Sequence, residues 1–364
     1  MSWEDHESMF RPETVHMGLM VSDPDLCDAC KLCIENCPLG TLEFDENKHI
    51  RAIEGAACFS CFNCMVACDQ GAMSIKEVYH VDEGFYATDP QPLSVAPPLE
   101  PLDAKGDVDE WTTVERAVME RRSVRNYRSR PVPDHLIRRV LEAGRFAPSG
   151  GNCQPWKFVV VTDKAMIKEM DASIAQGCTM MHTAYMDDEL VKNLVPMYEA
   201  NPSPGTYDPR IAVGGLGSVA RNVLPVFLGA PVVILIAIDE RAIGGPEIAA
   251  GICGQNMNMV ALSLGLGACW VGFSQLIELN PPLKEKLALK DPWKVQSALV
   301  MGYPKFEQEG LVPREDRPVT WFREGGEGPE FESQASSGSG DRPRESKNGE
   351  SKNGESKNGN KSNA

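Results

Sequence analysis

The sequence predicts a small cysteine-rich domain followed by a larger globular domain that mixes helices and strands, in the α/β or α+β class. Eight of the 12 cysteines fall before residue 80, in two runs of the same spacing. Beyond residue 110, segments with helical and strand periodicity alternate, which is typical of a mixed fold. The 364 residues are too many for one typical domain, and 42% are apolar, enough for a sizeable core.

Composition divides the chain into four segments. Residues 1–80 form the cysteine-rich domain, and residues 81–110 form a linker rich in proline and acidic side chains. Residues 111–325 are predicted to be globular. Residues 326–364 consist mainly of Gly, Ser, Glu, Lys and Asn and contain three copies of Glu-Ser-Lys-Asn-Gly. We expect this last segment to be disordered, because it has almost nothing apolar to bury.

Three helices are predicted in the globular segment. Thr112 and Glu115 form a capping box at the start of the first, and Asp134 is expected to cap the second. The third helix is predicted over residues 248–266. The apolar residues expected on one face of the first helix are Val114, Val118 and Met119, and those of the second are Leu136, Ile137, Val140 and Leu141.

Three strands are predicted between and after these helices, over residues 158–161, 232–238 and 295–301. The first is predicted to be a buried strand, and the second is an apolar run too continuous to have an exposed face. The alternation of these strands with the helices gives the mixed fold class.

The net negative charge is concentrated in the first 110 residues. Residues 1–110 hold 22 acidic and 6 basic side chains, and the whole chain has a formal charge of −16. Such a domain is a poor partner for nucleic acid or an anionic membrane surface. The first ten residues are acidic and contain no apolar segment of the kind that a secretory signal has. The longest uncharged run lies between Arg221 and Asp239 and is too short for a membrane span. We therefore expect a cytoplasmic protein whose cysteines bind metal or do redox work.

Each cysteine run has the spacing C-x2-C-x2-C-x3-C. Two-residue gaps place three thiolates on one tight loop, and the fourth cysteine of each run reaches the other cluster in two-cluster ferredoxins. The spacing predicts two [4Fe–4S] clusters, with zinc as the alternative. Residues 20–77 resemble the bacterial two-cluster ferredoxins, with Asp69 where proline usually follows the second run. The predicted ligands are Cys27, Cys30, Cys33 and Cys68 for one cluster, and Cys58, Cys61, Cys64 and Cys37 for the other.

Four further motifs follow the linker. They are Arg121-Arg122-Ser123-Val124-Arg125, the segment 147–156 around Pro148-Ser149-Gly150-Gly151-Asn152, the segment 265–273, and Gly302-Tyr303-Pro304 with Arg314 and Arg317 beyond it. The arginine run alone could equally be a solvated basic helix end or an anion site. Taken together, the motifs over residues 113–322 are similar to the FMN-dependent nitroreductase family. The resemblance implies an α+β fold with FMN as cofactor and a homodimer.

The resemblance also implies roles for individual residues. Arg121, Arg122, Ser123 and Arg125 would hold the FMN phosphate and the polar edge of the flavin, together with Arg314 and Arg317. Gly267 and Gly272 would let the backbone approach the flavin ring. The residues that would line the ring are Ala268, Cys269, Trp270, Val271 and Gly272, and those that would reach it from the other subunit are Pro148, Ser149, Asn152 and Gln255.

Residues 174–225 do not align with the family, so flavin and substrate contacts in that stretch are not assigned, and no catalytic residue is named. Gly215-Leu216-Gly217 lacks the strand and the third glycine of a dinucleotide fingerprint. We expect the four cysteines outside the two runs to pack in the core.

The predicted function is that of an iron–sulfur flavoprotein oxidoreductase. It would pass electrons from the clusters to FMN and on to a nitroaromatic, a quinone or a similar small conjugated acceptor. Either a ferredoxin or NAD(P)H could be the donor. Two alternatives remain open: an NAD(P)H-dependent nitroreductase whose clusters are an electron outlet, and an electron-carrier subunit of a larger redox complex.

Overall fold

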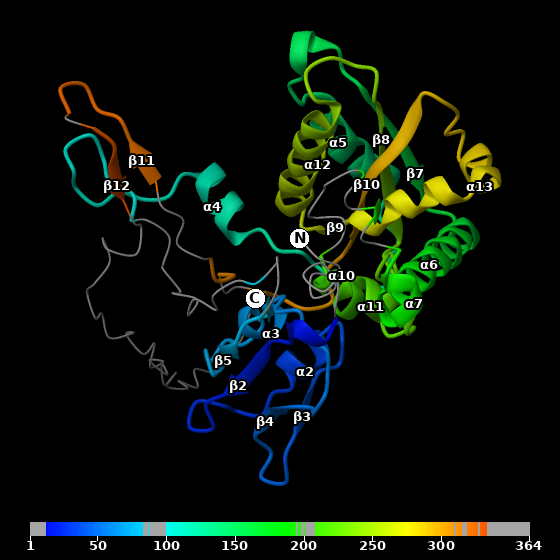
Figure 1. Ribbon diagram of the computed structural model, residues 1–364. Helices are drawn as coiled ribbons and strands as arrows, with labels where there is room; N and C mark the ends of the chain where they lie inside the picture. The colour runs from blue at the N-terminus through cyan, green and yellow to red at the C-terminus, as the bar shows by residue number, and fades with distance from the viewer. Residues whose placement is uncertain are drawn as a thin grey trace, which may run out of the picture. The chain divides into compact units, whose positions relative to one another are not determined.

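The computed structural model describes residues 12–82, 87, 100–193, 196–197, 200, 208–308, 311–314, 319–326 and 328–332 (Figure 1). Residues up to Glu315 form one compact unit, and residues from Asp316 onward form a second. The linker residues 83–86 and 88–99 and the tail residues 333–364 lie outside this description. None of the helices in the described ranges combines the length and apolarity that a bilayer-spanning segment needs.

The cysteine-rich domain consists of two short helices between small antiparallel strand pairs. Strand β2 (Leu19–Ser22) pairs with β5 (Met73–Glu77), β3 (Leu42–Phe44) with β4 (Ile50–Ala52), and β1 (Val15–His16) with β6 (His80–Val81). Helices α2 (Leu32–Asn36) and α3 (Asn63–Val66) each carry the third cysteine of a run. The buried core is small and includes Cys33 and Cys64, so bound clusters would supply much of its stability.

The two cysteine loops share an unusual backbone. Ala29 and Lys31 have φ values of 58° and 71°, and Ser60 and Phe62, which lie 31 residues further on, have φ values of 53° and 60°. Residues with a Cβ rarely adopt this left-handed conformation. Alternating backbone conformations of this kind form concave nests of N–H groups, which are common at Fe–S sites.

The larger domain is built on a four-stranded antiparallel sheet in the order β7-β8-β10-β9 (Figure 1). The strands are β7 (Trp156–Val161), β8 (Val232–Asp239), β9 (Gly267–Val271) and β10 (Trp293–Gly302). Strand β8 is central and almost completely buried, because its β-branched and aliphatic side chains pack on both faces of the sheet.

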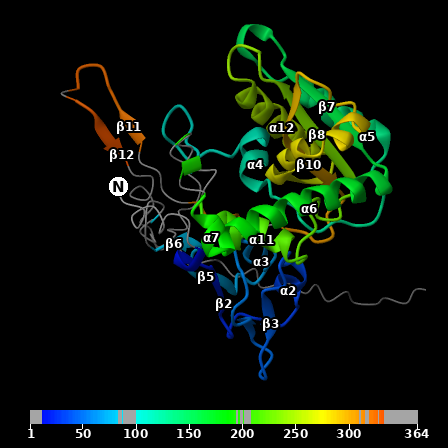
Figure 2. The same cartoon turned by 45° about the vertical axis from the view of Figure 1, so that its right-hand side comes forward.

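Helices cover both faces of this sheet (Figure 2). Helices α5 (Asp134–Arg145) and α12 (Pro246–Ser263) pack on one face, against Val232 and Ile234 of β8. Helices α6 (Lys164–Met186) and α11 (Gly215–Ala220) pack on the other face, against Val233 and Leu235. The period of two along β8 therefore separates the core into two apolar layers.

The remaining elements are short. They are η1 (Pro12–Thr14), α4 (Thr113–Glu120), η2 (Gly150–Asn152), α7 (Asp188–Val191), α10 (Arg210–Val213), η3 (Gly272–Leu279) and α13 (Pro281–Lys286) in the first unit, and the hairpin of β11 (Val319–Trp321) and β12 (Glu330–Glu332) in the second.

Most of the predicted elements are confirmed, and three details are wrong. The capping box of Thr112 and Glu115 is present at the start of α4. Asp134, however, is the first residue of α5 and Pro133 occupies the capping position. Val114 and Val118 are exposed, so α4 has no buried apolar face within this chain. Strand β7 lies at the sheet edge and is only partly buried.

Truncating the centre of β8 should strongly destabilise the fold. Leu235→Ala would leave a cavity between the sheet and α6, because Leu235 is fully buried. We expect the free energy of unfolding to fall by about 2–5 kcal/mol. Val160→Ala on the edge strand β7 is the control, since that side chain is 37% exposed. Urea unfolding followed by circular dichroism measures both variants, and equal losses would contradict the two-layer core.

Candidate functional site

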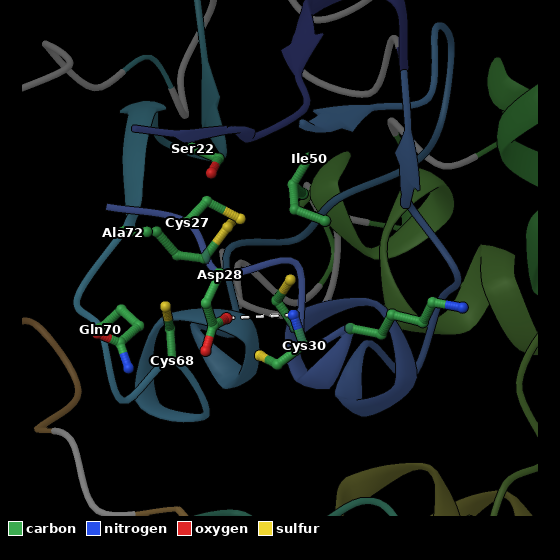
Figure 3. A pocket seen from close by; sticks show the side chains of 11 residues that line it. Ser22, Cys27, Asp28, Cys30, Ile50, Cys68, Gln70 and Ala72 are labelled. Carbon is green, nitrogen blue, oxygen red and sulfur yellow. Dashed lines mark hydrogen bonds between the residues drawn. The ribbon is translucent and has the colours of Figure 1, made fainter. Parts of the chain in front are cut away.

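The first group of cysteines lines a cavity in the cysteine-rich domain. Cys27, Cys30, Cys33 and Cys68 line one small pocket. Figure 3 shows Cys27, Cys30 and Cys68 around this space, and the carboxylate of Asp28 accepts a hydrogen bond from the Cys30 backbone N–H at 3.1 Å. The fourth cysteine of the second run therefore lies with the first three of the first run.

The second group consists of the other four cysteines of the two runs, Cys37, Cys58, Cys61 and Cys64. Burial, with smaller contributions from the charges of Cys61 and Cys37, raises the pKa of Cys58 to about 11. Burial likewise raises the pKa of Cys64, again with contributions from Cys61, Cys37 and Cys58. Cys37 is thus close enough to the second run to share its electrostatic environment.

The donor set fits iron–sulfur clusters. Burial, with smaller contributions from neighbouring thiols, raises the pKa of Cys33 to about 11. Buried thiolates so close together need cations to compensate their charge. Within the described ranges, no three His, Cys, Asp or Glu side chains converge on a point suited to one metal ion. In the first group the thiols instead surround a cavity, as ligands at separate corners of a cluster would.

Three arginines form a second site at the end of α4. Burial and, to a smaller extent, the nearby charges of Arg121 and Arg314 lower the pKa of Arg122 to about 10, while Glu120 opposes them. Burial also lowers the pKa of Arg121, with Arg314 contributing. The positive charges of these arginines lie close together and are partly buried. This arrangement destabilises the fold unless an anion binds between them.

The hydrogen bonds of this arginine cluster are incomplete. Arg122 Nη1 donates to the carbonyl oxygens of Met119 and Arg121 at 2.8 and 2.9 Å. The remaining buried donors, Arg121 Nε and Arg122 Nε and Nη2, have no hydrogen-bond partner among the described residues. A phosphate offers acceptors in the geometry that guanidinium groups prefer, so the cluster fits the phosphate of FMN.

The loop after α4 lies directly against β9. Ser123 forms a bridge with Ala268, and the Val124 backbone N–H donates to the Ala268 carbonyl at 3.0 Å. A Cβ on Gly267 would lie 2.5 Å from the Val124 side chain, so this glycine makes room for the loop. The approach of Gly267 to the flavin itself stays a prediction. At Gly272 an added Cβ would enter open space.

Burial and hydrogen bonding characterise the ring-lining segment. Ala268, Cys269 and Val271 are buried in β9, and Trp270 is partly buried. Burial raises the pKa of the Cys269 thiol, against the opposing effects of the Arg125 charge and a hydrogen bond with Ser123. Residues 268–272, which resemble the family's flavin-contacting segment, therefore lie beside residues 121–125, which we call the arginine loop.

The side chain of Arg125 contacts the cysteine-rich domain. Its Nη1 donates to Oδ1 of Asn63 at 3.0 Å, and its guanidinium lies 5.7 Å from the centre of the Phe59 ring. Next to it, Asn126 Nδ2 donates to the carbonyl and Oδ1 of Asn36 at 3.1 and 3.3 Å. The loop after α4 therefore contacts the cysteine-rich domain through Arg125 and Asn126, and the expected contact of Arg125 with the flavin edge stays a prediction.

Sequence reasoning missed four residues of this contact. They are Asn36, Phe59, Asn63 and Asn126. Asparagines and a phenylalanine have no distinctive spacing, so only their positions next to the cysteines could have drawn attention to them.

The other predicted flavin residues are spread over two elements. Ser149 and Asn152 belong to the loop after α5, where Ser149 Oγ accepts from the Gln154 backbone N–H at 3.0 Å. Gly150 in this loop would carry a Cβ only 2.8 Å from Gly244, so the loop packs against residues 243–244. Pro148 lies at the start of the same loop and Gln255 is partly buried in α12. Arg317 lies outside the described residues.

The cysteines outside the two runs differ in burial. Cys178, Cys253 and Cys269 are buried in the two layers of the core, as expected. Cys153 is exposed, so its expected place in the core is wrong. It lies in the loop after η2, where its thiol donates to the Ile243 carbonyl at 3.5 Å.

Comparison with known proteins agrees with this arrangement. Residues 118–303 match the nitroreductase family, and residues 19–69 match the 4Fe-4S dicluster domain. A nitrobenzene nitroreductase from Ectopseudomonas oleovorans is 24% identical over 208 residues, which cover 52% of this chain and 86% of that protein. An NADH dehydrogenase from Thermus thermophilus is 55% identical over 49 residues, 14% of this chain and 24% of that protein.

Among solved structures, a nitroreductase with bound FMN from Desulfitobacterium hafniense DCB-2 is similar at 22% sequence identity and a TM-score of 0.41. The match covers 56% of this chain and 96% of that one. The nitroreductase match extends over half of the present chain and includes Arg121, Arg122 and the whole sheet with β9, whereas Arg314 lies beyond it. The chain therefore belongs to the nitroreductase family and carries a 4Fe–4S dicluster domain in front of its nitroreductase domain.

Proposed function

We propose that the chain is an iron–sulfur flavoprotein oxidoreductase that passes electrons from two [4Fe–4S] clusters to FMN and on to a small conjugated acceptor. The main support for this proposal is the pair of hydrogen bonds between Asn126 and Asn36. Asn126 follows the arginine loop and Asn36 precedes Cys37, so these bonds bring the predicted flavin site and a predicted cluster ligand close together. A nitroaromatic, a quinone or a similar planar oxidant fits the family, and the relative from Ectopseudomonas oleovorans is named for a nitroaromatic.

FMN is the cofactor of the nitroreductase domain. Arg121, Arg122 and Arg314 would hold its phosphate, because buried donors of Arg121 and Arg122 lack partners among the described residues and Arg314 lies close enough for its charge to lower the pKa of both. Ser123 and the residues of β9 would lie along the flavin, where Gly272 leaves open space. When bound, FMN supplies the hydride or paired one-electron chemistry, and the protein supplies binding and electrostatics.

The two clusters belong to the dicluster domain. We assign one to Cys27, Cys30, Cys33 and Cys68, and the other to the remaining four cysteines of the two runs. The shared cavity supports the first set, and the mutual electrostatic effects of the thiols support the second. The backbone nests at Lys31 and Phe62 would direct N–H groups toward the anionic clusters.

A homodimer would complete the flavin site and cover exposed apolar side chains. Val114 and Val118 of α4 are 70% and 51% exposed, and Phe146 and Ile248 are also exposed. Isolated exposed apolar residues are common, but two on one helix face favour an interface. Pro148, Ser149, Asn152 and Gln255 would then approach the partner's flavin. Free thiols and iron–sulfur clusters suit a cytoplasmic location.

A comparison of electron donors tests the direction of electron flow. Anaerobically purified protein, checked for iron, sulfide and flavin, is mixed with reduced ferredoxin, NADH or NADPH while flavin bleaching is followed by stopped flow. We expect the ferredoxin-type donor to bleach the flavin fastest, because the clusters accept single electrons. Steady-state reduction of nitrobenzene and of a quinone should follow the same order of donors.

The matched variant is Cys61→Ala, which removes a ligand of the second cysteine group. It should slow bleaching by reduced ferredoxin and leave bleaching by NADPH unchanged. Fast NADPH bleaching in both proteins, with little reaction from ferredoxin, would contradict the proposal and favour an NAD(P)H-dependent nitroreductase. Purified protein that contains zinc in place of iron would contradict it as well.

A further inference from the structure

The two polar contacts between the dicluster domain and the loop after α4 end at the same group of cysteines. Arg125 Nη1 donates to Asn63 Oδ1 at 3.0 Å, and Asn63 directly precedes Cys64. Asn126 Nδ2 donates to the carbonyl of Asn36 at 3.1 Å, and Asn36 directly precedes Cys37. Cys37 and Cys64 both belong to the second group of cysteines.

These asparagines are also joined to each other. Asn36 Nδ2 donates to the Asn63 carbonyl at 3.2 Å, and both side chains are almost fully buried. The contact therefore brings the nitroreductase domain to the region where helices α2 and α3 meet. Buried, mutually bonded amides hold such a contact in one geometry.

On the nitroreductase side, the same loop reaches the flavin-lining strand. Arg125 Nη1 also donates to the Ser123 carbonyl at 3.3 Å, and the Val124 N–H donates to the Ala268 carbonyl at 3.0 Å. A short series of covalent and hydrogen bonds thus connects the Cys64 backbone, through Asn63 and Arg125, to β9.

The first group of cysteines has a different position. All residues that line its cavity belong to the dicluster domain, between Ser22 and Met73. Cys30 in this group is exposed, whereas Cys64 in the second group is buried. A soluble electron donor can therefore approach the first group, and the second group lies toward the nitroreductase domain.

From this arrangement we propose that the cluster held by Cys37, Cys58, Cys61 and Cys64 is the one that exchanges electrons with the flavin, and that Arg125 is the positioning residue that joins this cluster to the flavin loop and raises its reduction potential. The inference rests on the proposed function, since it assumes both cofactors. Each transfer moves one electron. Two transfers, each followed by re-reduction of this cluster from the first one, deliver the pair that the acceptor takes up. The electrons come from a one-electron donor of the ferredoxin class.

Arg125 acts on this cluster in two ways. Its positive charge favours the reduced form, which carries one more negative charge than the oxidised form. It also orients Asn63, because a guanidinium has only donors and must face the amide oxygen. Asn63 Nδ2 is then directed away from Arg125 and, among the described residues, has no partner. This buried N–H can donate to a cluster or thiolate sulfur, which raises the potential further.

The test is a redox titration of both clusters followed by electron paramagnetic resonance, in wild type, Arg125→Gln and Arg125→Lys. Arg130→Gln is the matched control, because it removes one positive charge from the same loop at an exposed position over the Tyr303 ring. The cluster signals are assigned with Cys30→Ala and Cys61→Ala, which each remove one ligand. Iron and FMN contents near wild type show that each arginine variant is folded.

We expect Arg125→Gln to shift the one-electron equilibrium of the cluster that Cys61→Ala disturbs by about ten-fold, which corresponds to about 59 mV toward lower potential. The other cluster and the Arg130→Gln protein should stay near wild type. Arg125→Lys, which keeps the charge, should recover most of the shift. FMN should remain bound to all three arginine variants.

Three results would overturn the inference. They are an unchanged potential in Arg125→Gln, a shift confined to the cluster that Cys30→Ala disturbs, and loss of FMN without a shift. The rates of flavin bleaching by reduced ferredoxin and by NADPH are measured separately by stopped flow. The expected shift together with faster flavin bleaching by NADPH would support the cluster assignment while contradicting the proposed direction of electron flow. Purified wild type without iron or flavin would overturn both.

Discussion

The double variant Arg121→Ala/Arg314→Ala is expected to lose FMN during gel filtration. Both side chains belong to the cluster around Arg122, and the buried Arg121 Nε has no partner among the described residues. A charged hydrogen bond is worth roughly 1.5–3 kcal/mol, so removing two should weaken FMN binding by about two to four decades. Arg122 is kept, because its Nη1 donates to two carbonyls at the end of α4. Isothermal titration of FMN into the flavin-free protein measures the loss.

The control for this experiment removes two charges elsewhere. Arg51 and Arg241 form exposed ion pairs with Glu43 and Asp239 at 2.7 Å, so Arg51→Ala/Arg241→Ala should retain FMN. The flavin-free Arg121→Ala/Arg314→Ala protein should be at least as thermally stable as flavin-free wild type, because the like charges around Arg122 repel each other. Unchanged FMN affinity, or a large loss of stability in the flavin-free form, would show that these arginines serve the fold and not the cofactor.

Removing the fourth cysteine of one run is expected to damage the cluster of the other run. Cys37→Ala should abolish the paramagnetic signal that Cys61→Ala also abolishes, because Cys37 lies with the second run in space. Cys68→Ala should abolish the signal that depends on Cys30, with which it shares a cavity. In each variant the iron content should fall by about half, since one of two clusters is lost. Iron and sulfide assays with low-temperature spectra of the reduced protein check this.

Cys253→Ala is the control for cysteine removal. This thiol belongs to α12 and is buried in the core with Val232 and Ile234 of β8, outside both runs, so both signals and the iron content should be retained. If Cys37→Ala abolished the signal that depends on Cys30, the fourth cysteine would serve its own run. The placement of the second cluster beside the nitroreductase domain would then need a different set of ligands.

Much of the fold could be predicted because its elements follow local rules. The capping box of Thr112 and Glu115 needs only a spacing of three residues, and it is present. The apolar run at 232–238 predicted a fully buried strand, and β8 contains it. Strand β9 was not predicted as a strand, because its small residues and its single tryptophan have no clear period of two.

The exposure of Val114 and Val118 could not be derived from helical periodicity. Periodicity predicts that one helix face is apolar, but it does not say whether that face is covered by the same chain, by a partner or by solvent. The same limit applies to β7, whose position at the sheet edge depends on strand order. Strand order is a property of the assembled sheet, so neither outcome has a local signal.

The sequence by itself determined the chemistry of this protein, because thiols at two-residue gaps and adjacent arginines carry their ligand preferences wherever they are placed. Only the tertiary structure decided which of these groups meet. It brings Arg125, which its motif assigned to the flavin, to Asn63 of the cysteine-rich domain, and it places Asn126 against Asn36. These contacts join residues more than 60 positions apart, whose meeting depends on how two different parts of one compact unit pack together. No short-range pattern in the chain encodes that packing, and the proposed order of the two clusters depends on it.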